Sequence, residues 1–171
     1  MEIITHAELL EILHYEPDTG VFTWRKAMSK RIRPGMVAGS TYMYRGKRVT
    51  QVGVLGRSYL ASRLAWLYVT GAWPIGVVDH WNGDSGNQSW SNLRDVTQKT
   101  NIENQRQASR RSISGLLGVG WNKRDSIWTA NITVVENGKK RNKYLGRFQG
   151  KHQAHAAYLE AKRRLHAGCT I

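Results

Sequence analysis

The sequence predicts an α+β fold, because signals for short helices and for antiparallel strands both occur along the chain. Residues 59–69 place apolar side chains at helical spacing, whereas residues 128–134 alternate apolar and polar side chains in strict period two. Asn137-Gly138, which follows directly, is a strong hairpin signal. Apolar residues make up 40% of the chain, enough for a packed core.

The first part of the chain predicts a helix and hairpin region. Thr5 and Glu8 form a capping-box signature at the start of a short helix ending near His14. The elements expected after it are a turn at 17–20, a strand at 21–24, a basic loop at 25–40, strands at 41–44 and 48–54 joined by a tip at 45–48, and a helix at 59–69.

The middle of the chain predicts a strand, a loop, a second strand and a helix. The strands are residues 77–80 and 93–96, and the loop between them is rich in Asn, Gly and Ser. Thr97 is a candidate N-cap for a helix that continues to about Ala108. We therefore expect one domain over residues 1–108, with its core at about 77–108, followed by a flexible basic linker at 109–115.

Residues 116–171 predict a second, smaller domain. Its elements are strands at 118–123, 128–134 and 143–148 and a helix at 153–166. Alanines recur on one face of this helix, so the helix can lie close against a sheet. We expect a three-stranded antiparallel sheet backed by one helix.

The charge of the chain indicates a polyanionic partner. The net charge is +14, and residues 107–171 hold 13 Lys and Arg against 3 Asp and Glu. Residues 79–106 hold 3 Lys and Arg against 4 Asp and Glu, so the only part that is not basic lies between two basic parts. Charge alone does not choose DNA over RNA, and a merely soluble basic surface has the same composition.

The composition also excludes several classes of protein. Cys169 is the only cysteine, so neither a disulfide within the chain nor a zinc site of four cysteines can form. No apolar run approaches the roughly 20 residues of a membrane span, and the first residues lack the features of a signal peptide. We expect a cytoplasmic protein with no membrane partner.

Three short motifs suggest a specific chemistry. Asp79-His80 ends the strand at 77–80, Asn92-Leu93-Arg94 begins 12 residues after His80, and Asn101 lies 9 residues further on. This pattern resembles the catalytic core of the HNH endonucleases, in particular the phage subgroup that includes intron-encoded homing enzymes. The resemblance implies the strand, loop, strand and helix arrangement called ββα-metal. A lone Asp-His pair usually means nothing, and loop asparagines ordinarily serve turns; the joint spacing favours the nuclease.

The HNH resemblance also implies roles for the individual residues. Asp79 and Asn101 match the ligands of one divalent ion, and their oxygen atoms favour Mg²⁺ or Mn²⁺ over Zn²⁺. His80 matches the general base that takes a proton from water. Asn92 belongs to the catalytic motif as the residue that ties down the loop behind His80. No small-molecule cofactor is expected, and Asn87, Arg94 and Asn104 are further candidates for contacting phosphate or bracing the helix.

One geometric requirement follows from the Asp79-His80 pair. Adjacent residues of a regular strand point to opposite faces, so both side chains can serve one site only if the chain bends there. We expect a bend or bulge, supplied by the loop that begins at Trp81.

Residues 116–167 resemble the AP2 DNA-binding domain in the Gly-Val-x-Trp of 118–121, the Trp-x-Ala-x-Ile of 128–132 and the Leu-Gly-x-Phe of 145–148. The resemblance implies that the sheet enters the major groove of double-stranded DNA; a generic structural domain is the alternative. Alternation places one set of side chains on the DNA face, together with others from the first and third strands. These residues are Asn122, Lys123, Arg124, Thr129, Asn131, Thr133, Tyr144 and Arg147.

A second basic surface is expected at the hairpin tip, where Arg45, Lys47 and Arg48 would grip phosphates. Together, the resemblances imply a monomeric DNA endonuclease of the phage homing or freestanding mobile type, in the host cytoplasm if phage-encoded. The rival is a non-catalytic regulatory or architectural DNA-binding protein that keeps these folds. RNA binding without cleavage is a third possibility, and it has no motif of its own.

Overall fold

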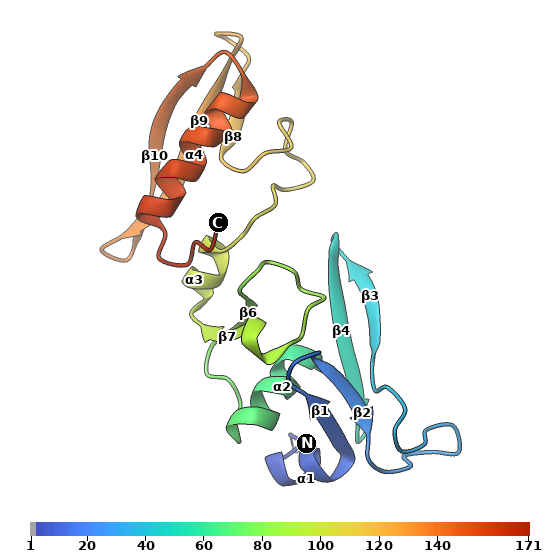
Figure 1. Cartoon of the computed structure of the whole chain (residues 1–171). Coiled ribbons are helices and arrows are strands. Elements are labelled where there is room, and N and C mark those ends of the chain that lie inside the picture. The colour runs from blue at the N-terminus through green and yellow to red at the C-terminus, as the bar shows by residue number, and fades with distance from the viewer. Residues whose placement is uncertain (1–2) are drawn as a thin grey trace. The chain divides into compact units, whose positions relative to one another are not determined.

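A computed structural model describes residues 3–171, which form four helices, one 3₁₀ turn and several small antiparallel sheets (Figure 1). This architecture agrees with the α+β class. The chain divides into two compact units, Met1–Gln98 and Lys99–Ile171, each described by itself below. Their boundary falls earlier in the chain than residues 109–115, where the sequence predicts a linker. Within residues 3–171, no helix is both long enough and apolar enough to cross a membrane.

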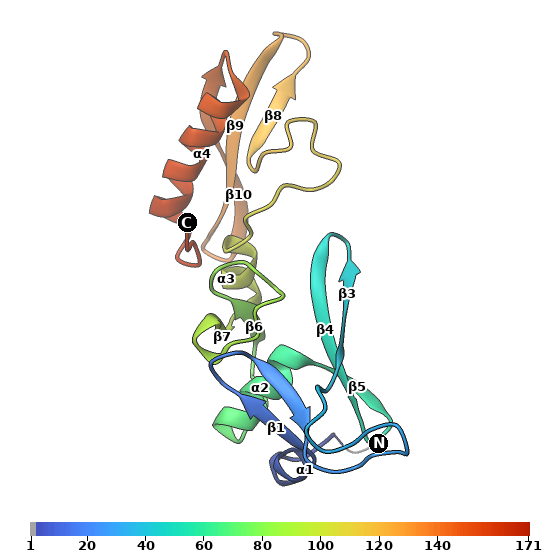
Figure 2. The ribbon, with the colours of Figure 1, turned by 45° about the vertical axis from the view of Figure 1, so that its right-hand side comes forward.

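The first unit contains two helices and three small sheets. Its elements in chain order are α1 (His6–Ile12), β1 (Leu13–Glu16), β2 (Val21–Trp24), β3 (Ser40–Tyr44), β4 (Lys47–Val54), β5 (Arg57–Leu60), α2 (Ala61–Thr70), β6 (Val77–His80), the 3₁₀ turn η1 (Trp90–Asn92) and β7 (Leu93–Val96). The sheets pair β1 with β2, β3 and β5 with β4, and β6 with β7. The long hairpin of β3 and β4, with its two strands side by side, can be followed in Figure 2.

The start of the chain differs from the prediction at one point. The capping box of Thr5 and Glu8 is present, but α1 ends at Ile12 because the following residues form β1, a strand that the sequence analysis missed. Leu13 and Tyr15 of β1 are buried while the residues between and after them are exposed, which is the alternation of a half-buried strand.

The hairpin of β3 and β4 is confirmed, with Arg45 and Gly46 at its tip in the left-handed region (φ 50° and 83°). A further strand, β5, pairs with the end of β4 and was also missed, so α2 begins at Ala61 rather than at Tyr59. Leu64 and Leu67 of α2 are buried in the apolar core of this unit.

The pairing of β6 with β7 is regular through His80, opposite Leu93. The strand itself therefore has no bulge at Asp79 and His80, and the bend expected there is supplied by the loop that begins at Trp81, as predicted. The chain turns immediately afterwards, because the Gly83 amide donates to the His80 carbonyl oxygen (2.8 Å).

The second unit contains α3 (Gln98–Glu103, beginning at the last residue of the first unit), β8 (Val119–Asn122), β9 (Ile127–Glu136), β10 (Lys139–Phe148) and α4 (Lys151–Leu165). The sheet has the order β10-β9-β8, and α4 packs on it (Figure 1). Three antiparallel strands and one helix are thus confirmed. By contrast, α3 ends at Glu103 rather than near Ala108. The Asn104 amide makes the last i→i−4 bond, to the Thr100 carbonyl oxygen (3.0 Å), and the Gln105 amide already bonds to the nearer carbonyl oxygen of Ile102 (3.1 Å).

The strand alternation in β9 matches the prediction. Ala130, Ile132 and Val134 are buried, and Ile132 packs against Tyr158 and Ala161 of α4. The hairpin turn to β10 lies at Asn137 and Gly138, both with positive φ (50° and 74°), as the Asn-Gly signal predicts.

Candidate functional site

Asp79 lies opposite Arg94 in the β6–β7 pair and is only 7% exposed. Both Nε and Nη2 of Arg94 donate to the same carboxylate oxygen, Oδ2, at 2.9 and 2.7 Å. Burial of a carboxylate is costly unless the charge is compensated. The regular register of the two strands therefore places a cation beside the predicted metal ligand.

Arg94 is itself covered by an aromatic ring. Its guanidinium carbon lies 4.8 Å from the ring centroid of Trp81, the residue after His80. This cation–π contact restrains the Arg94 side chain, which in turn restrains Asp79. Trp81, Arg94 and Asp79 thus form one stack at the end of the β6–β7 hairpin.

His80 is oriented by a residue that sequence reasoning missed. Its Nε2 lies 3.2 Å from Oε1 of Gln88, whose amide nitrogen donates to the carbonyl oxygen of Ser85 (2.7 Å). That second bond sets which end of the Gln88 amide faces His80, so Nε2 of His80 carries the proton. In the neutral ring, Nδ1 is then the nitrogen that accepts a proton.

The surroundings of His80 favour its neutral form. Burial lowers the pKa of His80, outweighing the opposite effects of the Gln88 hydrogen bond and of the nearby Asp79 and Asp84 carboxylates. A neutral imidazole at physiological pH is the form that a general base requires.

The hairpin of β1 and β2 holds the segment around Gln88 in place through hydrogen bonds. The buried hydroxyl of Tyr15 donates to the Gln88 carbonyl oxygen (2.6 Å), and the Trp90 amide donates to the carbonyl oxygen of Pro17 (2.8 Å). Gly20 has φ 75°, and a Cβ there would lie 2.2 Å from the Gln88 carbonyl carbon. Only glycine therefore fits this close approach.

Asn92 closes the loop that separates His80 from β7. Its Oδ1 accepts from the Asn82 amide and its Nδ2 donates to the Asn87 carbonyl oxygen, both at 2.9 Å. Its own carbonyl oxygen accepts from the Trp81 amide (2.8 Å). Asn92 is buried, and these bonds tie it to the start of the loop at Trp81 and Asn82 and to Asn87 further along. Asn87, a further candidate for contacting phosphate or bracing the helix, accepts through its Oδ1 from the amide and the hydroxyl of Ser89.

The basic hairpin tip is tied to the same loop. Nη2 of Arg48 lies 2.8 Å from each carboxylate oxygen of Asp84, and the Ser85 hydroxyl donates to the Arg48 carbonyl oxygen (2.7 Å). Arg48 thus has a structural partner, whereas exposed Arg45 lies over the ring of Tyr44 (5.3 Å) and Lys47 is exposed at the tip. The contacts of all three with DNA stay predictions.

Asn101 lies on α3 and is half-buried in the second unit. Its pairing with Asp79 in one metal site stays a prediction of the motif spacing. Among residues 3–171, no group of three or more His, Cys, Asp or Glu side chains could hold a metal ion. A carboxylate and an amide oxygen nevertheless suit a hard cation that keeps several water ligands, as Mg²⁺ does.

The sheet of the second unit presents one polar face away from α4. Directly paired residues share a face, and the pairs are Thr129 with Arg147, Asn131 with Tyr144, and Thr133 with Asn142. Five of these six residues were predicted on the DNA face, and Asn142 is the addition. A Gly146 bulge between Tyr144 and Arg147 keeps both on that face.

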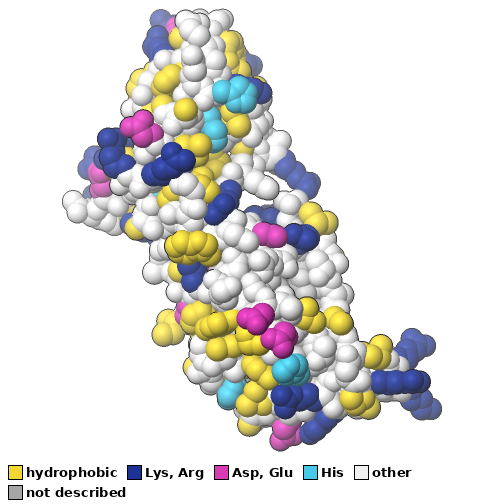
Figure 3. Space-filling view, viewed as in Figure 1, with side chains coloured by type: hydrophobic (Ala, Val, Ile, Leu, Met, Phe, Trp, Pro, Cys, Tyr) yellow, Lys and Arg dark blue, Asp and Glu magenta, His cyan; other side chains and the backbone are white. Residues whose placement is uncertain are grey.

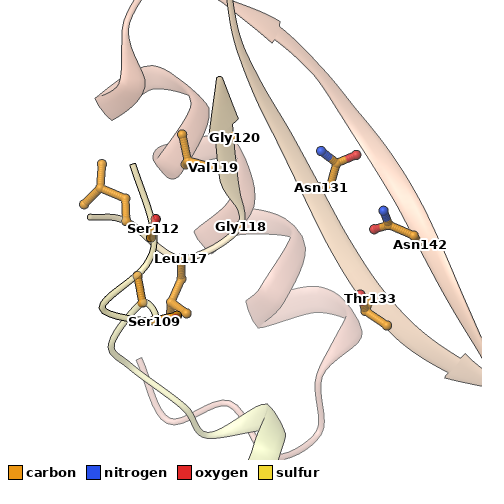
Figure 4. Close-up of a pocket in the computed structure, with 11 residues that line it drawn as sticks. Ser109, Ser112, Leu117, Gly118, Val119, Gly120, Asn131, Thr133 and Asn142 are labelled. Atoms are coloured by element: carbon orange, nitrogen blue, oxygen red, sulfur yellow. The ribbon is translucent and has the colours of Figure 1, made fainter. Parts of the chain in front are cut away.

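A shallow pocket of about 370 Å³ lies at one end of this face. Figure 4 shows Asn131, Thr133 and Asn142 on the strands, opposite the loop that carries Ser109 and Leu117. Ser109 and Ser112, which lie in the predicted linker at 109–115, therefore border the polar face within the second unit.

The turn between β8 and β9 uses some of the predicted DNA contacts for its own structure. Oδ1 of Asn122 accepts from the amides of Arg124 and Asp125, and its Nδ2 donates to the Asp125 carboxylate (3.0 Å). Asn122 is therefore a turn residue, while Lys123 and Arg124 are exposed beside it. Arg147 pairs with the same Asp125 (3.2 Å).

Figure 3 shows Lys and Arg side chains spread over the surface of both units, with a dense group at the lower right over the loop between β2 and β3. This loop holds Arg25, Lys26, Lys30, Arg31 and Arg33. The basic loop expected at 25–40 thus adds exposed cations to those of the hairpin tip, although only the tip was predicted to contact DNA.

Comparison with known proteins gives one match. A family model described as HNH endonuclease matches residues 59–104, which run from β5 through β6, the loop and β7 to the end of α3. The match supports an HNH endonuclease domain in this part of the chain, and with it a nuclease that acts on DNA. No curated protein and no solved structure matched the chain.

Proposed function

We propose that this chain is a metal-dependent HNH endonuclease that hydrolyses phosphodiester bonds of double-stranded DNA, of the phage homing or freestanding mobile type. The observation that carries the proposal is the arrangement around His80. The His80 imidazole, held by Gln88, follows the buried Asp79 carboxylate, and Asn92 closes the loop between His80 and β7. This arrangement lies inside the segment that matches the HNH family.

In the proposed reaction, Nδ1 of His80 takes a proton from the attacking water while Gln88 holds the opposite nitrogen. Asp79 and Asn101 would hold one Mg²⁺ or Mn²⁺, which supplies charge neutralisation at the phosphoryl and leaving oxygens. Arg94 keeps the Asp79 carboxylate in place and compensates its charge within the protein. Asn92 has no chemical part and maintains the loop that positions His80.

The proposed DNA contacts lie on two surfaces. The first is the polar face of the second unit, with Thr129, Asn131, Thr133, Tyr144 and Arg147, joined by Lys123 and Arg124 at the turn; the AP2 resemblance and the paired register support it. The second is the hairpin tip with Arg45, Lys47 and Arg48. Arg48 also binds Asp84, and Asn122, a further candidate at the β8–β9 turn, also binds Asp125. The face is rich in Thr and Asn, so base-specific contacts contribute less than phosphate contacts.

The rival function is DNA binding without cleavage, in a protein that keeps the HNH fold. Incubation of the purified chain with supercoiled plasmid separates the two. A nuclease converts the plasmid to nicked or linear DNA when Mg²⁺ or Mn²⁺ is present, and EDTA abolishes the conversion. Plasmid that is retarded in a gel but never cut supports the rival. The proposal also holds that the protein acts as a monomer in the host cytoplasm.

A further inference from the structure

The helix that carries Asn101 cannot be stable by itself. α3 has only 6 residues, and isolated helices of that length do not persist in water. In the part of the chain that the structure describes, none of the three apolar clusters includes a residue of α3, and Ile102 is 56% exposed. Within the second unit, α3 must therefore be ordered by polar contacts.

One contact comes from Gly168, beyond the end of α4. Its amide donates to Oε2 of buried Glu103 (3.0 Å). The backbone of Gly168 also lies directly against α3, because a Cβ at this position would come within 2.3 Å of the Thr100 carbonyl oxygen and 2.9 Å of the Glu103 Cβ. The fit between this segment and the helix is tight enough that a single methyl group would force them apart.

Further hydrogen bonds hold the residues at and just beyond the end of α3. The Thr170 hydroxyl donates to Oδ1 of buried Asn104 (2.5 Å), and Nη2 of Arg106 donates to the hydroxyl and carbonyl oxygens of Thr170 (2.6 and 3.0 Å). Lys162 of α4, 1% exposed, donates from Nζ to the carbonyl oxygen of Gln105. Gln105 lies two residues beyond the end of α3, so this bond ties the segment that leaves α3 to α4.

We infer that residues 166–171, together with Lys162, position α3 and therefore Asn101. The inference rests on the proposed function for the role of Asn101. All these bracing residues lie outside the segment that matches the HNH family, which ends at Asn104. The second unit then has two tasks: its sheet binds DNA, and its last residues complete the proposed metal site. Gly168 and Thr170 are positioning residues, because they act on the ion only through α3.

Hydrogen–deuterium exchange on the full chain tests the brace directly. Gly168→Ala forces the segment away from α3, so amides in residues 98–106 should exchange faster by about tenfold or more, with little change elsewhere. Gly53→Ala is the matched control, because its new Cβ meets no atom closer than 3.9 Å and its backbone is not in the left-handed region. Thr170→Val should give a smaller increase, and Thr170→Ser should restore the wild-type rate.

The consequence for the site is measured as Mn²⁺ affinity of the complex with duplex DNA, by calorimetry. Gly168→Ala should weaken this affinity about 10–100-fold, as loss of support behind a metal ligand does. DNA affinity without metal, measured by fluorescence anisotropy, should stay within about twofold of wild type, because the polar sheet face is untouched. Thr170→Val covers the case in which Gly168→Ala does not fold.

The inference is overturned if exchange in 98–106 is unchanged in both Gly168→Ala and Thr170→Val. It is also overturned if exchange rises while Mn²⁺ affinity does not change. Failure of the proposed function looks different: wild-type protein then leaves plasmid uncut at every metal concentration, while the exchange and calorimetry measurements still decide whether the segment positions α3.

Discussion

Oε1 of Gln88 accepts a hydrogen bond from Nε2 of His80 across 3.2 Å, and Gln88 is itself held through its amide nitrogen by Ser85 and through its carbonyl oxygen by Tyr15. A general base works only if the proton-accepting nitrogen faces the water, so the tautomer and the ring orientation both matter. Gln88 fixes both, although it neither meets substrate nor belongs to the motif that identifies the site.

Gln88→Met keeps the volume of the side chain and removes the acceptor. We expect cleavage to fall about 10–100-fold, since comparable supporting residues have effects of that size. DNA affinity should be unchanged. Gln149→Met, which alters an exposed glutamine, is the control. Equal cleavage rates for Gln88→Met and wild type in a plasmid assay would remove Gln88 from the mechanism.

Removal of Arg94 should destabilise the first unit by leaving Asp79 buried without its cation. Arg94→Met should cost about 3 kcal/mol in the free energy of unfolding. The double variant Asp79→Asn/Arg94→Met should lose less than Arg94→Met alone, because no buried charge remains. Urea titration of both variants and of the exposed control Arg110→Met measures this. A double variant less stable than Arg94→Met would contradict the ion-pair account.

Tyr15 predicts an alkaline limit to stability. Burial, with a smaller effect of Glu16, raises the pKa of the Tyr15 hydroxyl above its ordinary value of 10.0. The neutral hydroxyl therefore contributes stability in full below pH 10 and loses it as the pH rises above 10. Tyr15→Phe should cost about 1–3 kcal/mol at pH 8, because the Gln88 carbonyl loses its donor. The difference in melting temperature between wild type and Tyr15→Phe should shrink between pH 9 and 11; a constant or growing difference contradicts this.

The sheet register predicts opposite effects for neighbouring residues of β9. Asn131→Ala removes a side chain from the polar face, so it should weaken DNA binding and leave the melting temperature nearly unchanged. Ile132→Ala opens a cavity against Tyr158 and Ala161 and should cost about 2–5 kcal/mol. Anisotropy with duplex DNA and a thermal melt on both variants test the pair. Loss of the fold in Asn131→Ala with only weaker affinity in Ile132→Ala would reverse the assigned faces.

The sequence predicted the elements that have a clear period or a strong turn signal. The strict alternation of 128–134 and the Asn-Gly turn located β9 and its hairpin correctly, and the strand limits of β6 and β7 were also right. The strands β1 and β5 were not predicted, because each has only four residues and adjoins a helix. Such a short segment is easily assigned to that helix. The end of α3 was misplaced because residues 104–108 contain no Gly or Pro to mark it, whereas the backbone leaves the helix at Gln105, whose amide bonds to Ile102.

The residues of the candidate site were likewise predicted only in part. Asp79, His80 and Asn92 were found because their types and spacing match a known motif. Gln88 was missed since it is one polar residue in a loop full of them, and its importance depends on Tyr15, 73 positions away in sequence. The bend expected after Asp79 and His80 was predicted correctly, because the chain turns in the loop that begins at Trp81. Arg48 stays a predicted DNA contact, and its ion pair with Asp84 was not foreseen because the two residues lie 36 positions apart in sequence.

The most direct test of the account compares wild type with His80→Ala on supercoiled plasmid, in Mg²⁺ and in EDTA, with DNA affinity measured on the same samples. We predict that wild type nicks the plasmid only with the metal, and that His80→Ala binds DNA equally well but cleaves about 10²–10⁴-fold more slowly. A His80→Ala protein that nicks at the wild-type rate, or a wild-type protein that binds DNA and never cuts it, would contradict the account.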